Sequence, residues 1–218
     1  MIIITPLMLK RVFTSRIFLV IETFYLLAFP LILLRFKPDW IRLRLSVLIA
    51  SLIYVCSIIY TQRITAKQLG LKPDDWCGSL KTILPPTVFS LLLTFVVFKW
   101  FHDQFTIPLL IEEVKTPSVF LSVLIHILVS APLQEFIYRG YLISRLELVS
   151  PKPIFLKLYT AIFFMLIHTP FHNWLLTLSC LILGWWWAGH FLKFRNIFAL
   201  MLSHALIGSI YLILISLG

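Results

Sequence analysis

Residues 118–149 read SVFLSVLIHILVSAPLQEFIYRGYLISRLELV, a long apolar stretch that keeps charged side chains near its middle. A charge at membrane depth costs at least about 2.5–3.5 kcal/mol on insertion scales, so a segment that carries two is a candidate functional site. Glu135 and Arg139 are four residues apart, and on a helix this spacing places them on one face with the acid on the favourable N-terminal side. Gln134 and Tyr138 form an adjacent polar pair with the same spacing.

The composition of the whole chain is that of a membrane protein. Its 218 residues are 60% hydrophobic and 13% charged, with a mean hydropathy of +0.98. A soluble domain is nearer half apolar and about one-quarter charged. Spans of ~20 residues would use most of the length and leave no separate soluble domain. We therefore predict an all-α, polytopic bundle of about seven transmembrane helices.

Seven apolar runs are the predicted spans, at residues 17–34, 45–60, 83–101, 118–149, 154–169, 174–192 and 197–217. Pro85 and Pro86 fit the first turn of the third span, where proline is tolerated. The fourth run is long for one span, so its helix either continues past the membrane edge or bends at Pro132. We divide the chain into N-terminal transmembrane helices and loops (1–117) and a core membrane domain (118–218).

The charge pattern indicates a membrane partner. The formal net charge is +10, but Lys and Arg occur in small groups between apolar runs, which is typical of cytoplasmic loops that face anionic headgroups. This pattern predicts membrane lipids, and not nucleic acid, as partners. With the N-terminus inside, thirteen Lys and Arg lie on the cytoplasmic side and six on the other, so we expect a cytoplasmic N-terminus.

Acidic residues elsewhere have ordinary interpretations. Glu22 lies inside the first apolar run, and we interpret it as a helix-end charge or one satisfied by a partner. Asp103, Glu112 and Glu113 fall between two spans and are expected in a solvated loop.

Two histidines interrupt other apolar runs at a depth comparable to that of Glu135. At a rise of 1.5 Å per residue, Glu135 lies ~18 Å, His168 ~21 Å and His204 ~13 Å from the cytoplasmic helix ends. A buried carboxylate near a histidine can activate water, and a second histidine can donate to an oxyanion. His126 is two turns, ~12 Å, before Gln134 on the same face, where it is a packing residue or a donor behind the site.

No cofactor is expected, although one set of residues leaves zinc open. A catalytic zinc needs three protein ligands and an open position, and Glu135, His168 and His204 could supply three. No HExxH motif on one helix supports this alternative.

These residues resemble the CPBP family of intramembrane proteases, which includes type II CAAX prenyl endopeptidases and Abi-type bacteriocin-processing or immunity proteins. The sequence QEFIYR at 134–139 resembles the EExxxR motif, FMLIH at 164–168 matches FxxxH, and HALIG at 204–208 resembles HxxxN. The resemblance covers residues 118–210. It implies a membrane-embedded endopeptidase, in a cell membrane and most simply a bacterial inner membrane.

The resemblance also implies a role for each residue. His168 would activate water together with a motif-one acid, His204 would hold the oxyanion, and Arg139 would orient the acid. Two positions depart from the motifs. Gln134 replaces the first glutamate, and an amide cannot take a proton at neutral pH. Gly208 replaces the asparagine that would be a second oxyanion donor.

Three functions follow from these patterns. As an enzyme, the protein would hydrolyse a peptide bond of a membrane-associated peptide or prenylated protein, with Glu135 and His168 activating water. As a non-catalytic relative, it would use the same polar site to grip a peptide or a partner, as an immunity protein would. Paired charges in a membrane also mark transport paths, but no inverted hydropathy symmetry supports a transporter.

Overall fold

The computed structural model describes residues 12–36, 43–101 and 118–217, and these form long helices without strands. Six helices are long and apolar enough to cross a membrane, at Leu45–Gln62, Trp76–Trp100, Val119–Leu146, Pro153–Phe171, Trp174–Phe194 and Ile197–Leu217. The first helix, α2 (Arg16–Phe36), adds 21 residues. The prediction of an all-α polytopic bundle is confirmed. Asp103, Glu112 and Glu113 lie outside the described residues.

The long fourth segment is the central rod of the bundle. It runs without a break through α6 (Val119–Ile125), α7 (Ala131–Glu135) and α8 (Leu142–Leu146), joined by π-helical turns at 126–130 and 136–141. Proline lacks an N–H and its ring clashes with the preceding turn of an α-helix. The wider π turn before Pro132, in which the Ala131 N–H donates to the His126 carbonyl, accommodates this ring. The helix therefore continues and does not stop at Pro132.

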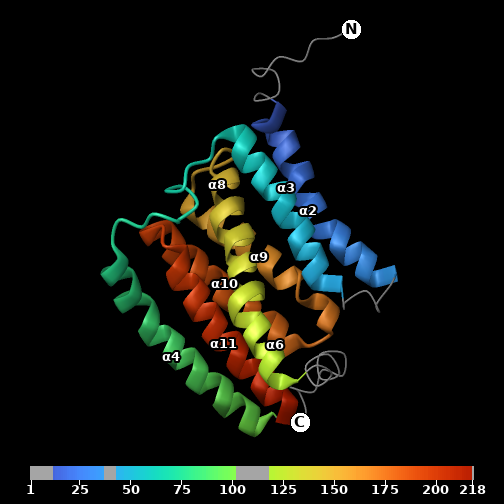
Figure 1. Cartoon of the computed structure of the whole chain (residues 1–218), viewed down its shortest axis with the longest axis vertical. Coiled ribbons are helices and arrows are strands. Elements are labelled where there is room, and N and C mark those ends of the chain that lie inside the picture. The colour runs from blue at the N-terminus through green and yellow to red at the C-terminus, as the bar shows by residue number, and fades with distance from the viewer. Residues whose placement is uncertain (1–11, 37–42, 102–117, 218) are drawn as a thin grey trace.

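The other helices surround this rod (Figure 1). The helices α2 and α3 (Arg44–Gln62) lie on one side of it, and α4 (Trp76–Trp100) lies on the other, against α11 (Ile197–Leu217). The helices α9 (Pro153–Leu166) and α10 (Trp174–Phe194) form the most extensive helix pair. Their closest approach includes Gly184, where an added Cβ would lie 3.1 Å from the Cα of Ala161. The small residue thus lets the two helices meet.

Two helix ends differ from the sequence-based prediction. The third span begins at Trp76 and not at residue 83, so Pro85 and Pro86 lie inside the helix and not in its first turn. The cause is a local cap, since the Asp75 carboxylate accepts a hydrogen bond from the Gly78 N–H at 2.7 Å. The fifth helix ends at Leu166, so His168 lies just beyond it, at the start of a short 3-10 turn (Thr169–Phe171).

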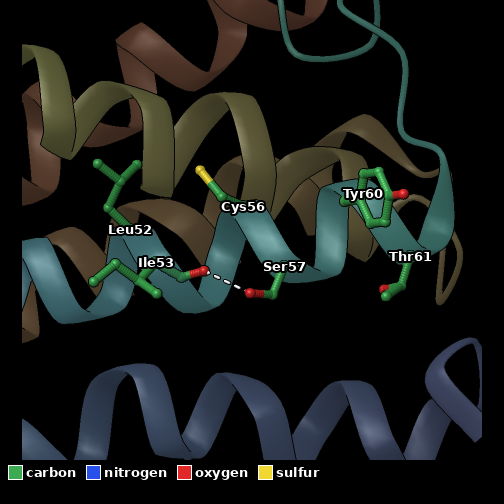
Figure 2. A pocket seen from close by; sticks show the side chains of 6 residues that line it. All are labelled: Leu52, Ile53, Cys56, Ser57, Tyr60 and Thr61. Atoms are coloured by element: carbon green, nitrogen blue, oxygen red, sulfur yellow. Dashed lines mark hydrogen bonds between the residues drawn. The ribbon is translucent and has the colours of Figure 1, made fainter.

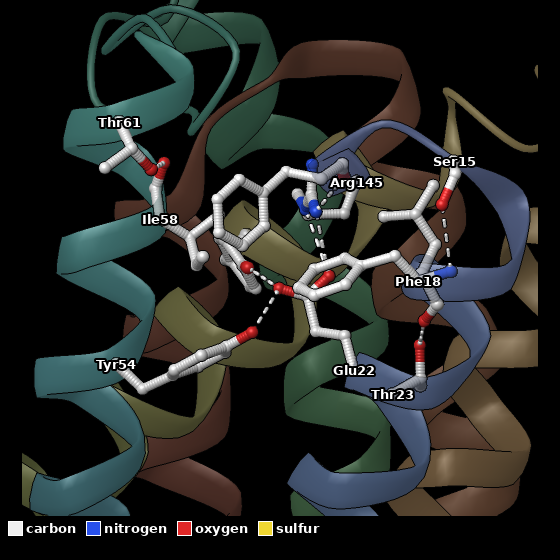
Figure 3. Close-up of polar contacts among 11 residues, drawn as sticks. Ser15, Phe18, Glu22, Thr23, Tyr54, Ile58, Thr61 and Arg145 are labelled. Atoms are coloured by element: carbon white, nitrogen blue, oxygen red, sulfur yellow. Dashed lines mark hydrogen bonds and ion pairs between the residues drawn. The ribbon is translucent and has the colours of Figure 1, made fainter. Parts of the chain in front are cut away.

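Glu22 binds several partners inside the bundle, which confirms its interpretation as a satisfied charge. Its carboxylate pairs with the guanidinium of Arg145 at 3.0 Å and accepts from the Tyr54 hydroxyl at 3.1 Å (Figure 3). The Tyr141 hydroxyl also donates to it, and Arg145 reaches the Phe13 carbonyl at 2.7 Å. This polar cluster joins α2 and α3 to α8. It is a second buried ion pair, separate from that of Glu135.

Candidate active site

Glu135 and Arg139 form a completely buried ion pair on the central rod. Nη1 of Arg139 lies 3.1 Å from Oε1 of Glu135, and neither side chain is exposed. The pairing that the four-residue spacing predicts is therefore present. The guanidinium thus offsets the charge of the carboxylate inside the bundle.

His204, from α11, completes this pair into a triad. Its Nδ1 lies 2.8 Å from the same Oε1 of Glu135. An ionised carboxylate can only accept hydrogen bonds, so Nδ1 carries a proton and donates it. The opposite ring nitrogen, Nε2, is then available either as a base or, when the ring is protonated, as a donor. The contact fixes which nitrogen of His204 can act on a substrate.

Aromatic rings hold the imidazole and the guanidinium in place. The His204 ring stacks on Trp187 at a centroid distance of 4.9 Å, and Phe164 meets it edge-on at 5.5 Å. The guanidinium of Arg139 lies over the Phe164 ring at 4.1 Å and near that of Trp187 at 5.3 Å. Such cation–π contacts strengthen when they are desolvated. Both side chains are thus packed against the same two aromatic rings.

A hydrogen-bonded chain extends from Trp187 to the neighbouring helix. The indole Nε1–H of Trp187 donates to the Ser203 hydroxyl at 3.0 Å, and Ser203 shares a hydrogen bond of 2.7 Å with Thr87 of α4. Trp187 packs, and it also positions His204.

His168 is linked to the triad through the Phe164 ring. Its ring is 4.8 Å from Phe164, which His204 also contacts. Nδ1 of His168 is 2.7 Å from the Phe164 carbonyl oxygen. A carbonyl oxygen only accepts, so Nδ1 carries the proton and Nε2 holds the lone pair. The backbone thus fixes His168 in the tautomer that a general base requires.

Gln134 neighbours the triad but bonds along its own helix. Its Nε2 donates to the Ser130 hydroxyl at 2.9 Å. Within the described part of the chain, no hydrogen bond reaches its buried Oε1 atom. An amide oxygen cannot take up the proton of water, but it can accept a hydrogen bond from it.

The structure thus unites three of the five predicted site residues by direct contact and links the fourth through Phe164. Arg139 and His204 both bind Glu135, His168 contacts the Phe164 ring that His204 also meets, and Gln134 precedes Glu135 in the chain. Sequence analysis gave His126 only a supporting role, yet its ring lies 5.4 Å from that of His204. The feature of the sequence that could have indicated this contact is Gly208, one turn after His204, because its missing side chain leaves room for the His126 ring.

The alternative zinc set does not form a cluster. Over residues 12–36, 43–101 and 118–217, no three His, Cys, Asp or Glu side chains are grouped so that they could hold a metal ion. Glu135 and His204 are in contact, and His168 is bound to its own backbone.

A surface hollow lies elsewhere, on the outer face of α3. A single stripe of that helix lines it, with side chains from Leu52, Ile53, Cys56, Ser57, Tyr60 and Thr61 (Figure 2). Its one polar contact in that view is the bond from the Ser57 hydroxyl to the Ile53 carbonyl, at 2.9 Å. Ile53 and Tyr60 are 65% and 86% exposed, as lipid-facing side chains of a span would be. The hollow contains none of the predicted site residues.

Residues 116–210 match the family model described as type II CAAX prenyl endopeptidase Rce1-like. The matched region contains the central rod, α9, α10 and the first two-thirds of α11, and with them all the site residues. No curated protein and no solved structure matches the chain.

Proposed function

We propose that this chain is an intramembrane endopeptidase of the CAAX-protease type, a proposal supported by the match of residues 116–210 to the Rce1-like family model. The observation that carries the proposal is the contact between Glu135 and His204, placed beside a histidine with a fixed tautomer. We propose that water attacks a peptide bond between these two imidazoles.

His168 is the proposed general base. Its Nδ1–H is occupied by the Phe164 carbonyl, so Nε2 can take the proton of the attacking water. The Oε1 atom of Gln134 can accept the second hydrogen of that water and so orient it. As the C–N bond breaks, His168 returns the proton to the leaving amine. The products are a carboxylate and an amine.

His204 is the proposed oxyanion donor. When its ring is protonated, Arg139 and His204 carry two positive charges against one on Glu135, so the buried site has a net charge of +1. A developing oxyanion neutralises this charge, which is the condition under which preorganised donors accelerate acyl transfer. Glu135 stabilises the imidazolium and directs Nε2–H away from itself.

This assignment changes the role that the sequence suggested for Glu135. That carboxylate is 0% exposed and is held by both Arg139 and His204. Two donors already occupy its Oε1 atom, one from Arg139 and one from His204, and they hold the carboxylate in place. Glu135 is therefore a positioning residue in the proposed mechanism.

The proposed substrate is a peptide or prenylated protein at the membrane, since the site lies among helices that span it. Membrane lipids are the other expected partners. The loops at 63–75, 147–152 and 193–196, which together carry six Lys and Arg residues, share one end of the bundle with the start of α2 (Figure 1). Under the positive-inside rule, this end faces the cytoplasm of a cell whose inner membrane holds the protein.

A non-catalytic function is the second candidate, and two observations favour it. Position 134 carries an amide, and the only carboxylate of the triad is fully buried. Such a protein would bind a peptide, as an immunity-type protein does, without cleaving it.

Cleavage assays on purified protein in detergent separate the two functions. A quenched peptide library that includes farnesylated peptides would be incubated with the parent and with His204→Ala, with and without a chelator. The endopeptidase predicts turnover in the parent and a loss of ~10²–10³-fold in His204→Ala. Peptide binding by the parent, measured by fluorescence anisotropy, without any cleavage would establish the binding function instead.

A further inference from the structure

We propose that His126 donates a second hydrogen bond to the oxyanion, from the space that the missing side chain of Gly208 leaves open. This inference rests on the proposed endopeptidase function and adds a catalytic residue to it. The residue comes from the central rod and not from α11.

Position 208 belongs to the same helix face as His204. The two residues are four apart on α11, so both point toward the central rod. A Cβ built at Gly208 would overlap Nε2 of His126 and lie 2.6 Å from its Cε1. The imidazole of His126 therefore occupies the volume into which any side chain at position 208 would project.

The nitrogen that fills this space is close to the proposed oxyanion donor. The rings of His126 and His204 are 5.4 Å apart, with an angle of 68° between them. Glu135 holds Nδ1 of His204 at 2.8 Å, which leaves Nε2 as the nitrogen that can donate to a substrate. An oxygen atom that accepts from Nε2–H of His204 would thus form within reach of a second imidazole.

The helix geometry explains how His126 reaches α11. His126 begins the π-helical turn before Pro132, and its carbonyl accepts the Ala131 N–H across this wider turn. Pi-helical turns often occur at functional sites, because the extra residue changes the direction of the side chains. Pro132 and Gly208 both contribute to this arrangement. Pro132 follows the wider turn, and Gly208 has no side chain in the space that the His126 ring fills.

A packing role and a donor role for His126 give different predictions. If the ring only fills space, Phe should replace it without loss, since it keeps the ring and its volume. If the ring donates, Phe should fold normally and lose turnover, because it lacks an N–H group.

The test is a set of variants measured for melting temperature and for peptide cleavage. We expect His126→Phe to melt like the parent and to lose ~10²–10³-fold in kcat, with KM little changed, as for loss of one oxyanion donor. Gly208→Asn should lower the melting temperature, because its Cβ meets the ring of His126. Combining it with His126→Ala should restore the melting temperature and raise kcat at least tenfold above His126→Ala, since the new amide supplies the donor.

Each contrary result has a distinct meaning. Parental kcat in His126→Phe, or no recovery in the double variant, would overturn the donor role and leave the endopeptidase standing. No turnover in the parent would overturn the endopeptidase and the donor role together. In that case the melting temperatures would still show whether residues 126 and 208 share one space.

Discussion

Glu135 and His204 are 69 positions apart in the chain, and their side chains meet at 2.8 Å in the centre of the bundle. The contact ties α11 to the central rod and gives the imidazole a fixed direction. The same carboxylate oxygen also pairs with Arg139 at 3.1 Å, so one acidic group holds both side chains. Stability and the proposed chemistry therefore depend on one carboxylate.

Glu135→Gln should lower turnover strongly while the protein still folds. The amide keeps the volume and can accept from Nδ1 of His204, but it supplies no negative charge to the imidazolium. We expect kcat to fall by ~10²-fold or more, in the range of a lost electrostatic stabiliser. Initial cleavage rates at saturating peptide, with circular dichroism as the folding control, would check this. Unchanged turnover would remove Glu135 from the mechanism.

Arg139→Ala should destabilise the protein as well as inactivate it. Removing one partner of a buried ion pair typically costs about 3–5 kcal/mol, because the other charge remains without compensation. The measurement is the melting temperature in detergent, together with the yield of folded protein. A variant that expresses and melts like the parent would show that Glu135 does not depend on Arg139.

Arg145→Ala provides a matched comparison for a buried pair outside the site. Arg145 binds Glu22 at 3.0 Å and reaches the Phe13 carbonyl, so its loss should destabilise the bundle by a similar amount. Its kcat per folded molecule should equal that of the parent. An inactive but fully folded Arg145→Ala would mean that the Glu22 cluster also takes part in the reaction.

Trp187→Phe should destabilise the protein less than the loss of a buried ion pair does. Phenylalanine retains a ring beneath the imidazole but loses the hydrogen bond to Ser203, a cost of about 0.5–1.5 kcal/mol. Trp186→Phe, at a partly buried neighbouring position, is the control. Thermal unfolding of both variants side by side should show the larger decrease for Trp187→Phe. Equal decreases would argue against a special role for the indole N–H.

Gln134→Glu should raise the rate of cleavage. A carboxylate next to the site can share the proton of water with His168, which an amide cannot do. We expect an increase of at least tenfold in kcat, measured on the same peptide as for the parent. A lower rate would mean that the amide of Gln134 orients the water better than a carboxylate does.

Helical periodicity predicted much of this architecture. The four-residue spacing of Glu135 and Arg139 led directly to their ion pair, and the run at 197–217 coincides with α11. Counting residues from the cytoplasmic helix ends also placed His204 at a depth in the membrane similar to that of Glu135. These features follow from the rise per residue of a helix and from residue spacing, which can be counted in the sequence.

Other features depend on geometry that spacing does not describe. The start of α4 was placed too late because the cap at Asp75 was not recognised among the polar residues before it. His126 begins a π-helical turn, and its ring lies near that of His204. Counting residues along a regular α-helix does not predict the position of a side chain in such a turn. The hydrogen bond from His168 to the Phe164 carbonyl depends on a side-chain rotamer at the helix end.

The central claim is that His168 activates water to cleave a peptide, and one comparison tests it most directly. The parent and His168→Ala would be assayed on the best-cleaved peptide in water enriched in oxygen-18, with mass spectrometry of the products. The account predicts one heavy oxygen in the new carboxyl group with the parent, and a rate lower by ~10²–10⁴-fold in His168→Ala. Equal rates in the two proteins, or no labelled product from the parent, would contradict it.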